Sequence, residues 1–564
     1  MNPANLEFSR PEQTKYTFDV VIAGGGFAGI YAAKALAAKL GSSACTRVAI
    51  VAEQNFMLFQ PMLAEVAGSS LSPTHVVNPI RALCKNVTVI RGSIASVDLD
   101  ARRLEVKTGD FSGSVAVNFE HLSLAIGGVV DLSRVPGMAE HAFLLKNVGD
   151  ALRLRMAIID RFEEAAVTPD PAERRRLLTY VVVGGGYSGV EVAGQIIDVC
   201  REIVRYYPSV PTDSFRVVLA HSGKQLLPEI SGSLGRYCEE NLRSRGVEIM
   251  LGVRASAMTS GKIFFGDHIV LAHTVVTTVG NAPNPVLLKL IKDYSLPSEK
   301  GRVLTDSTFR VEGRDRLWAA GDCAAVPMPK TKPLSPTAQR QFCPPTAQFA
   351  MRQGKLMGEN IAAALENRGR GRPFKFSGLG ELAAIGHRAA VAEIMGLKFS
   401  GFIAWIMWRT IYLSKLPGLE RKIRVMIEWT LDLFFPRDIS LLESRPTQVI
   451  KESFCTAGDM LCHAGEPAFF FYIVKSGRIE LFNADNTPSR SVLPGDHFGE
   501  RALLNDQIWH VTAIAAEDST VVAIGASAFE SVLGADASIR EFLLKTASNA
   551  AMDPEKTAQE LAIR

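Results

Sequence analysis

Short apolar runs that pass into a glycine-rich turn and then into an apolar helical pattern are the most regular feature of this chain. The pattern occurs twice, about 160 residues apart, with a strand expected at 19–23 before the turn at 24–29 and another at 180–183 before the turn at 184–189. A continuous apolar run of this length is typical of a strand buried on both faces. Strand, turn and helix in this order predict a dinucleotide-binding unit, so we expect the chain to hold two dinucleotides.

Both turns have the spacing G-x-G-x-x-G. In such a turn the first glycine permits the tight bend, the second lets the backbone approach a pyrophosphate, and the third lets the helix pack closely on the strand. The pyrophosphate lies at the start of the helix, where free amide groups and the helix dipole favour negative charge. The glycines expected to bind a cofactor in this way are Gly24, Gly26 and Gly29 in the first turn and Gly184, Gly186 and Gly189 in the second.

A further apolar run, at 317–320, ends in Gly321 and Asp322. In flavoproteins that hold two nucleotides, this pattern places a carboxylate on the ribityl chain of FAD, whereas the plainer alternative is a strand end capped by a turn aspartate. With the first glycine turn taken as the FAD site, the second is expected to bind NADH or NADPH. A flavin accepts a hydride from a nicotinamide and returns the electrons to another acceptor, so the chain is expected to be an oxidoreductase.

Length and composition agree with a chain of several folded domains. The 564 residues, 47% of them hydrophobic, have room for about three or four domains. The first ten residues contain no apolar run typical of a secretory signal, so we expect the chain to stay in the cytosolic compartment. No helix-turn-helix pattern or strongly basic tail occurs, so nucleic acid is not an expected partner.

The eight cysteines limit the redox mechanism. They are scattered without a C-x-x-C pair, so neither a disulfide framework nor a metal site is predicted, and the cluster of Cys455, Cys462 and His463 is interpreted as structural. Disulfide reductases and sulfide:quinone oxidoreductases need a pair of cysteines at the flavin. No cysteine lies between Cys84 and Cys200, and Cys343 has no evident partner. Electrons are therefore expected to leave the flavin without a sulfur relay.

Several further segments resemble one family, the type II NADH:quinone oxidoreductases, which are single-subunit, non-pumping respiratory dehydrogenases. The resemblance covers about residues 15–440. It implies an α/β fold of two interleaved Rossmann-type domains that passes electrons from NAD(P)H through FAD to a membrane quinone, and it implies a homodimer. The segments that carry the resemblance are 55–63 with 65–68, 124–128, 178–194, 319–323 and 344–354.

The resemblance also implies roles for particular residues. Glu191, two positions after the last glycine of the second turn, would lie where nicotinamide, flavin and quinone meet and would supply a proton to the quinone. Its plainer interpretation is a carboxylate stabilised by the helix dipole. Gln348 lies in a segment that lines the quinone tunnel, and Arg352 stands where the family has a second glutamine. Gly127 is implied in FAD binding, and Gly280 in the loop over the nicotinamide.

Two departures from the family concern the nucleotides. His221 ends the strand at 215–220, at a position where NADH-selective relatives have a glutamate that binds the ribose 2′-hydroxyl and repels a 2′-phosphate. We therefore expect NADPH to be used comparably to NADH. In the first unit Glu53 follows the strand at 48–52, one position later than the family's acidic residue, and is expected to bind the adenosine ribose of FAD.

An aromatic and basic segment near residue 400 predicts contact with a membrane. Residues 401–416 combine aliphatic and aromatic positions with Arg409 and Lys415, and a basic helix follows. No run reaches the roughly 20 apolar residues that span a bilayer. A helix pair of this kind suits the interface of an anionic membrane, and burial in a dimer interface or against the core is the alternative. We expect peripheral attachment to the cytoplasmic face of the cell membrane, from which an apolar quinone would enter.

The last ~125 residues have the pattern of a small β-barrel, with short strands and glycine turns. Phe498-Gly499-Glu500 resembles the cyclic-nucleotide-binding domain family, in which the glutamate binds the ribose. Trp509 stands where that family has the arginine that pairs with the phosphate. Three hypotheses follow: a degenerate docking barrel, a sensor of another ligand with Trp509 stacked on a base, or a weak cyclic-nucleotide site.

The expected organisation is an α/β body, a helical segment and a barrel. The predicted parts are an FAD domain in two pieces (15–150 and 301–380), an NAD(P)H domain (151–300), an amphipathic helical segment for membrane or dimer contact (381–440), the barrel (441–550) and a tail (551–564). Two functions compete. One is an NAD(P)H:quinone oxidoreductase with a regulatory barrel, and the other is a regulatory flavoprotein that signals its redox state through the barrel.

Overall fold

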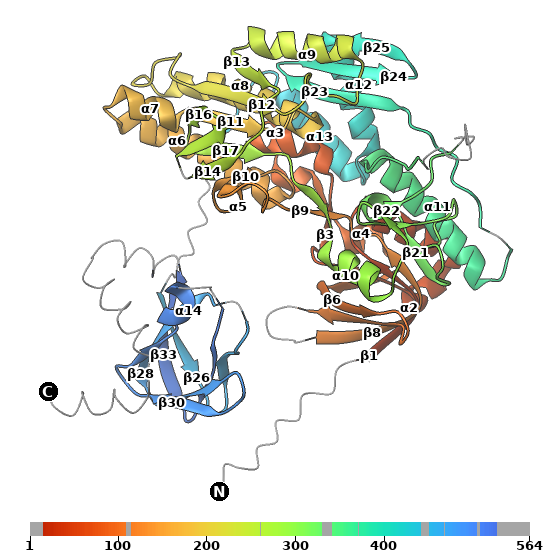
Figure 1. Ribbon diagram of the computed structural model, residues 1–564, viewed down its shortest axis with the longest axis vertical. Coiled ribbons are helices and arrows are strands. Elements are labelled where there is room, and N and C mark those ends of the chain that lie inside the picture. Colours follow the sequence, from red (N-terminus) through yellow and green to blue (C-terminus); the bar gives the residue numbers. More distant parts are fainter. Residues whose placement is uncertain are drawn as a thin grey trace, which may run out of the picture. The chain divides into compact units, whose positions relative to one another are not determined.

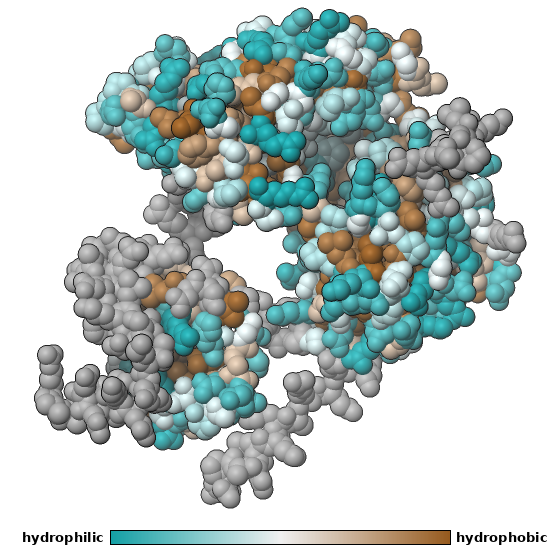
Figure 2. Space-filling model, in the orientation of Figure 1, coloured by the Kyte–Doolittle hydropathy of each residue, from teal (hydrophilic) through white to brown (hydrophobic). Residues whose placement is uncertain are grey.

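The computed structural model describes residues 15–108, 114–259, 261–329, 341–369, 371–440, 450–466, 468–504, 508–526 and 529. The chain divides into two compact units between residues 441 and 442 (Figure 1). On the face shown in Figure 2, hydrophilic side chains predominate and hydrophobic ones are interspersed among them.

The first unit contains a sheet built around β1 (Lys15–Ala23). β1 lies parallel to β2 (Val48–Ala52) on one side and to β8 (Ser114–Leu124) on the other. All five residues of β2 are buried, as expected for a strand covered on both faces. The order is β5-β2-β1-β8-β7-β6, with β21 (Leu317–Ala319) beside β8. The remaining strands are β5 (Thr88–Arg91), β6 (Ser93–Asp98) and β7 (Arg103–Lys107).

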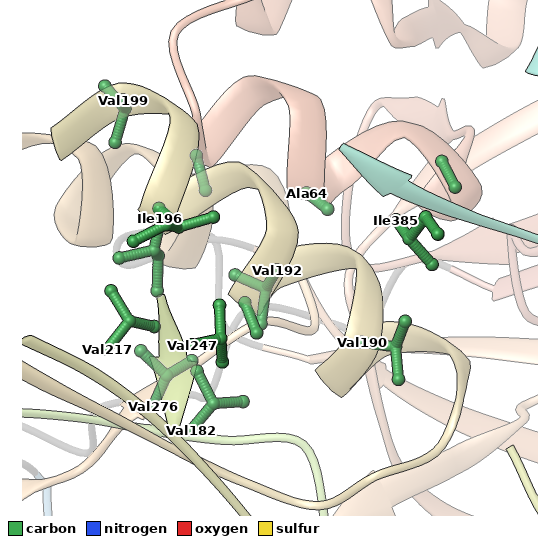
Figure 3. Packing of buried hydrophobic residues seen from close by; sticks show 14 of the residues in the cluster. Ala64, Val182, Val190, Val192, Ile196, Val199, Val217, Val247, Val276 and Ile385 are labelled. Atoms are coloured by element: carbon green, nitrogen blue, oxygen red, sulfur yellow. The ribbon is translucent and has the colours of Figure 1, made fainter. Parts of the chain in front are cut away.

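The second sheet of this unit is entirely parallel, in the order β10-β17-β11-β12-β13. Helix α8 (Tyr187–Ile203) follows the second glycine turn, and Figure 3 shows its apolar residues against valines of four strands. The strands are β10 (Phe143–Leu144), β11 (Thr179–Val183), β12 (Arg216–His221), β13 (Val247–Leu251) and β17 (Thr274–Thr277).

The two Rossmann-type parts are interleaved in sequence, because β21 and helix α11 (Ala347–Leu365) return to the first sheet after the second is complete. Helix α11 packs tightly along α1 (Phe27–Leu40). A Cβ on Gly354 would lie 2.1 Å from the carbonyl oxygen of Ala28, so only glycine permits this contact. The predicted α/β class with two interleaved dinucleotide-binding folds is confirmed.

The segment predicted as helical at 381–440 contains a small sheet as well as helices. β23 (Gly380–Gly386), β24 (Ala389–Ile394) and β25 (Leu397–Ser400) form an antiparallel sheet before α12 (Gly401–Lys415) and α13 (Leu419–Leu431). β23 lies against α8, where a Cβ on Gly194 would be 2.4 Å from the carbonyl oxygen of Ile385. Among the described residues, no helix has the length and hydrophobicity needed to cross a bilayer.

In the described part of the second unit, two four-stranded antiparallel sheets are accompanied by the short helix α14 (Glu500–Leu504). The sheet orders are β26-β33-β28-β31 and β27-β32-β29-β30. The predicted small β-barrel is therefore present. The strands are β26 (Ile450–Cys455), β27 (Met460–Cys462), β28 (Phe470–Ser476), β29 (Ile479–Asn483), β30 (Pro488–Val492), β31 (His497–Phe498), β32 (Val511–Ala515) and β33 (Ser519–Gly525).

Candidate active site

One cavity of about 720 Å³ in the first unit brings together segments that are far apart in the sequence. It is lined by the first glycine turn, the starts of α8 and α11, the turn after β21, and the C-terminal end of α12. The cavity combines backbone of a glycine turn with charged and apolar side chains, and its volume is sufficient for more than one ligand group. The predicted site residues that line it are Gly26, Gly127, Glu191, Asp322, Gln348 and Arg352.

The first turn has the geometry that a pyrophosphate needs. Gly24 has φ +118°, and a Cβ on Gly29 would lie 1.9 Å from the Gly24 carbonyl oxygen. Gly26 caps α1 without a side-chain hydrogen bond, and a Cβ there would meet no atom within 4 Å. Open space beside free amides at a helix start is a cradle for an anion.

Asp322 faces the same cavity from the turn after β21, and burial raises the pKa of its carboxyl. The backbone of Gly321 before it is held in place by the side chain of Gln353 on α11, whose Oε1 accepts its N–H at 2.9 Å. Gly127, with φ +64°, also lines the cavity and has no neighbour within 4 Å of a Cβ position. Together with the first turn, these residues offer the open backbone and the carboxyl group that FAD would need, so they fit this cofactor.

The second turn repeats the first. Gly184 has φ +118°, and a Cβ on Gly189 would lie 1.7 Å from the Gly184 carbonyl oxygen. Gly186 caps α8 without a side-chain hydrogen bond and has open space around it. Gly280 has φ +90°, and a Cβ there would be 2.7 Å from the Asp131 carbonyl oxygen. The residues on either side of Gly280 line the cavity, although Gly280 does not.

His221 at the end of β12 lies against the second turn. Its Nδ1 accepts the Gly185 N–H at 3.1 Å, so the proton of the ring is on Nε2. Burial lowers the pKa of the imidazole, which favours this neutral form. Nε2 is buried and has no hydrogen-bond partner among the described residues. A donor at this position differs from the carboxylate that would accept a ribose hydroxyl.

Glu53 lies just beyond the corresponding strand end of the first unit and is exposed to solvent. The two strand ends correspond closely, because the Gly24 N–H donates to Val51 at 2.8 Å and the Gly184 N–H donates to Ala220 at 2.9 Å. Ala52 therefore corresponds to His221, and Glu53 corresponds to the residue after it. Neither unit has a carboxylate at the strand-end position itself.

Glu191 is buried on the first turns of α8 and lines the main cavity. Its Oε1 accepts the backbone N–H of Ala384 at 3.2 Å and the indole N–H of Trp408 at 3.3 Å. Burial raises the pKa of its carboxyl from 4.5 to about 8. A carboxyl group with this pKa is protonated at neutral pH and is able to donate that proton.

A second buried glutamate, Glu65, was not assigned a role from the sequence. It lies on α3 (Leu63–Ala67), and its Oε2 accepts the indole N–H of Trp429 at 3.0 Å. Burial raises the pKa of its carboxyl to about 7. The sequence did contain a sign of this residue, since Glu65 is the single charged residue in the apolar run 62–67. A glutamate in such a run is rarely buried without a specific reason.

Gln348 and Arg352 occupy the first two turns of α11 at the edge of the cavity. The Gln348 side chain bridges to β23, since its Nε2 donates to Gly380 at 3.3 Å and its Oε1 accepts the Leu379 N–H at 3.4 Å. The Arg352 guanidinium lies 4.0 Å from the centre of the Phe376 ring and donates to the Gln348 carbonyl at 2.7 Å. Gln348 therefore links α11 to residues 379–380 in the cavity wall, and Arg352 places a positive charge at the edge of the cavity.

The cysteines do not contribute to the walls of this cavity. All eight are within the described residues, all are free, and none lines the cavity. Cys323 and Cys343 are buried in the core, and burial raises the pKa of each thiol to about 11. A thiol with so high a pKa is a poor nucleophile at neutral pH. Within the described residues, no group of three or more His, Cys, Asp or Glu side chains forms a metal site.

In the barrel, Trp509 occupies the space beneath the turn before α14. Its ring is buried and lies 6.1 Å from Phe498 and 6.0 Å from Tyr472, centre to centre. A Cβ on Gly499 would be 2.9 Å from this ring. Glu500 is also buried, and its Oε2 has no hydrogen-bond partner among the described residues. The tryptophan therefore belongs to the barrel core, which favours a role in packing over stacking on a ligand.

Three sequence families account for almost all of the described chain. Pyridine nucleotide-disulphide oxidoreductase matches residues 18–354, the NDH2 C-terminal domain matches residues 379–438, and the cyclic nucleotide-binding domain matches residues 452–536. The chain belongs to the type II NADH:quinone oxidoreductases, within the pyridine nucleotide-disulphide oxidoreductase family. The resemblance inferred from the motifs is thereby confirmed.

Relatives and solved structures agree with this assignment. The type II NADH:quinone oxidoreductase NdhA of Mycobacterium tuberculosis is 30% identical over 425 residues, covering 73% of this chain and 86% of NdhA. The structure of NDH2 from Plasmodium falciparum in complex with NADH has a TM-score of 0.68 at 16% identity, covering 75% of this chain and 99% of that one. The sulfide:quinone oxidoreductase of Aquifex aeolicus is more distant, with a TM-score of 0.55 at 16% identity, covering 74% and 95%.

The type II assignment makes this protein a flavin-dependent oxidoreductase. FAD and a nicotinamide nucleotide, the cofactors predicted from the two turns, are those of the family. The barrel after residue 441 is an additional domain, and its resemblance to cyclic-nucleotide-binding domains is also confirmed.

Proposed function

We propose that this type II oxidoreductase transfers two electrons from NADH or NADPH, through FAD, to a membrane quinone without translocating protons. The observation that carries the proposal is the single cavity in which the first glycine turn, Asp322, Glu191 and the start of α11 meet. Bound FAD supplies the two-electron carrier, which accepts a hydride and delivers electrons to the quinone. The protein residues bind it, orient both partners and supply a proton.

Glu191 is the proposed proton donor to the quinone. Reduction to the quinol forms two O–H bonds, and the hydride carries only one of the two hydrogens. Glu191 is protonated at neutral pH and faces the cavity, so it is suited to supply the second. The hydrogen bonds from Ala384 and Trp408 hold its carboxyl in one orientation.

The quinone is proposed to enter between the start of α11 and the end of α12. This part of the cavity has apolar walls from Leu379 and Ile411, with Arg352 and Lys415 beside them. A cation is suited to bind a quinone carbonyl, which gains negative charge during reduction. Gln348 contributes by holding β23 in place, so its replacement is expected to weaken quinone binding indirectly.

Both nicotinamide nucleotides are proposed as donors. A neutral His221 ring stands where a carboxylate would repel a 2′-phosphate, and Lys224 follows on the exposed side of the strand end. Gly184, Gly186, Gly189 and Gly280 would hold the pyrophosphate and the nicotinamide half. A steady-state preference for NADH of about a thousandfold, or about 4 kcal/mol, would contradict this part of the proposal.

Peripheral membrane attachment on the cytoplasmic face is proposed through α12 and α13. Both helices present large apolar side chains to solvent, and basic residues flank them, an arrangement that suits a membrane interface. The alternative, a homodimer interface on the same face, shares the apolar surface. Complete release from membranes by high salt without detergent would argue against an apolar anchor. The exposed residues are Phe402, Ile403, Ile406, Leu419, Ile423, Met426, Ile427, Leu431, Phe434 and Phe435.

The barrel is proposed as a docking or regulatory module that does not bind a cyclic nucleotide. The interpretation is supported by Trp509, which is buried in the barrel core and stands at the position of the family's arginine. Micromolar binding of cyclic AMP or cyclic GMP in a calorimetric titration would reverse it. The domain limits predicted above, including the tail at 551–564, remain part of this proposal.

Stopped-flow spectroscopy tests the function. The protein is mixed with NADH or NADPH, and the reduced flavin is then mixed with a soluble quinone. We expect rapid bleaching with both nucleotides and rapid recovery of the flavin absorbance with quinone. The fused barrel favours a second candidate function, a redox-responsive regulator. Rapid reduction without reoxidation by quinone would support that regulator and overturn the enzyme proposal.

A further inference from the structure

We propose that Glu65 relays protons from a second, charged cavity to Glu191, so that the proton used in quinone reduction reaches the main cavity from inside the protein. The inference rests on the proposed quinone reductase function. It extends that function by assigning a route and a relay residue for the proton, and it begins from a cavity that the electron-transfer steps do not use.

The second cavity has a volume of about 610 Å³ and is rich in charged residues. Its inner wall includes Glu65, Gln195 and Ala384, all of which are buried. Its outer wall is exposed to solvent at the ends of α8 and β23. The cavity therefore connects bulk water with a buried carboxyl group. The exposed charged residues of the outer wall are Arg201, Arg205, His387 and Arg388.

Ala384 links the two cavities. It lines the second cavity, and its backbone N–H donates to the Glu191 carboxyl, which lines the first. The wall between the two glutamates also contains a pair of tryptophans. Trp408 donates to Glu191, Trp429 donates to Glu65, and the two indole rings are 6.2 Å apart, centre to centre. Each indole N–H is used by one carboxyl oxygen, which leaves the other oxygen of each glutamate able to carry the proton.

The surroundings of Glu65 suit a group that is alternately neutral and ionised. Burial raises the pKa of Glu65 to about 7 and that of Glu191 to about 8, and the charge of Glu65 adds to the rise of the Glu191 pKa. Arg409 opposes the shift of Glu65, and this arginine lies 4.0 Å from the ring of Trp405 and 4.7 Å from that of Trp429. An arginine stays protonated, so it stabilises the carboxylate that remains after Glu65 gives up a proton.

Other charged groups face the two glutamates from the neighbouring elements. Asp432, after α13, lies 3.9 Å from Arg409 and 3.7 Å from Arg437, measured between ion-pairing atoms. Tyr412 on α12 is close enough to Glu191 for burial and that carboxylate to raise the pKa of its phenol. The phenol therefore stays neutral at physiological pH, and the carboxyl groups are the residues of this cluster that exchange protons near neutrality.

The proton balance is complete without another reagent. The overall reaction is NAD(P)H + H⁺ + quinone to NAD(P)⁺ + quinol, so each turnover takes one proton from solvent. The Glu191 O–H bond breaks as a quinol O–H bond forms, and the Glu191 carboxylate regains its proton from Glu65. Glu65 is then reprotonated from the second cavity. Glu65 does not touch the quinone in this scheme and acts through Glu191.

The alternative is that Glu65 only anchors α13 through Trp429. Glu65→Gln separates the two roles, because the amide oxygen still accepts the indole N–H but the side chain no longer titrates. We expect unchanged flavin reduction by NAD(P)H, quinone reoxidation slowed about 10–100-fold, and a larger solvent deuterium isotope effect on that step. Glu65→Asp should restore part of the rate.

The matched control is Glu428→Gln. Glu428 also anchors α13, since it accepts the Ser72 N–H at 2.8 Å and contacts His75 at 2.5 Å, but it lines neither cavity. We expect it to leave the isotope effect unchanged. A readout independent of turnover is the infrared C=O absorption of protonated buried carboxyl groups. The component that titrates near pH 7 in the wild type should be absent in Glu65→Gln, whereas the Glu191 component, which titrates near pH 8, should remain.

Three results are decisive. If quinone reoxidised the wild type and Glu65→Gln at the same rate, the relay would be overturned while the proposed function stayed intact. A slow Glu65→Gln variant with an unchanged isotope effect and an unchanged infrared band would assign Glu65 to structure alone, and would also overturn the relay. A wild-type protein that quinone does not reoxidise would instead contradict the proposed function.

Discussion

The two glycine turns of this protein have nearly the same backbone but different neighbours. The first glycine of each has φ +118°, and a Cβ on the third would lie 1.9 or 1.7 Å from the carbonyl oxygen of the first. Two residues beyond the third glycine, however, the first unit has Tyr31 and the second has Glu191. Tyr31 is partly exposed near Arg352, and Glu191 is buried beside Trp408.

The helices after the turns are also covered differently. α1 packs against another helix, α11, whereas α8 packs against the strand β23 and the helix α3. The turn geometry therefore suits a pyrophosphate equally well in either unit. We expect the role of each nucleotide to depend on the residues at the strand end and on the next turn of the helix. Substitutions at matched positions test this division.

The largest effect is expected from alanine at the third glycine of each turn. Gly29→Ala would force its Cβ against backbone, and we expect the protein to purify without yellow flavin. Gly189→Ala is expected to retain the flavin but to lose reduction by NAD(P)H, while chemical reduction by dithionite is preserved. Absorption spectra of the purified proteins measure both outcomes.

Gly232→Ala is the control for this pair, because its Cβ would lie 3.4 Å from the nearest side-chain atom and should be tolerated. If Gly29→Ala retained the flavin and Gly189→Ala lost it, the assignment of FAD to the first turn would be wrong.

The next largest effect is expected at the second residue after each third glycine. Glu191→Gln removes the proposed proton donor, so quinone reoxidation should slow by about 10²–10³-fold. Tyr31→Phe should change that rate by less than about threefold, because a phenol with a raised pKa is a poor proton donor at neutral pH. Stopped-flow reoxidation of prereduced enzyme measures both, and equal rates for the two variants would remove Glu191 from the proton step.

A smaller effect is expected at the two strand ends. His221→Glu places a carboxylate near the proposed 2′-phosphate, so the ratio of kcat/KM for NADPH to that for NADH should fall about 10–100-fold, or roughly 1.4–2.8 kcal/mol. Ala52→Glu is the matched change in the first unit and should leave that ratio unchanged. A ratio that did not respond to His221→Glu would show that another residue selects the nucleotide.

The smallest effect concerns stability and pH. The pKa of Glu191 rises from 4.5 to about 8 on folding, so its contribution to stability is fully present below about pH 4.5 and is lost as the pH rises through 8. We expect the wild-type Tm to fall by a few degrees more between pH 6 and pH 9 than the Tm of Glu191→Gln. Tyr31→Phe should follow the wild type over this range. Differential scanning calorimetry of the full chain measures the difference.

The parts of the fold with local signals were predictable. Each glycine turn combines a fixed spacing with a buried strand and a helix, and Asp322 follows a short apolar strand. Each of these features can therefore be recognised from a short stretch of sequence. The sheet at 380–400 was missed because alanines such as Ala383, Ala384, Ala389 and Ala390 favour helix in isolation. They form strands because β23 pairs with β24 and fits against Gly194 of α8, which is a tertiary effect.

The candidate site shows the same limit. Glu191 was predictable from its place beside the second turn, whereas its partner Trp408 lies 217 positions away and Trp429 lies 364 positions from Glu65. The second cavity consists of residues from several distant segments and has no sequence motif. In the barrel, the loss of the arginine at Trp509 was visible in the sequence, but the burial of that ring in the core depended on the fold.

Helix α11 both packs against α1 and lines the main cavity. Gly354 and Gly358 lie directly on the backbone of α1, where a single added methyl group would collide, while Gln348 and Arg352 at the start of the same helix line the cavity beside the proposed entrance for the quinone. Since the contact is between main chains, there are no side chains that can repack to absorb a shift. The distance between the turn proposed to hold the flavin and the proposed entrance for the quinone is thus fixed by contact between two main chains, so the two ends of the proposed electron path cannot move apart independently.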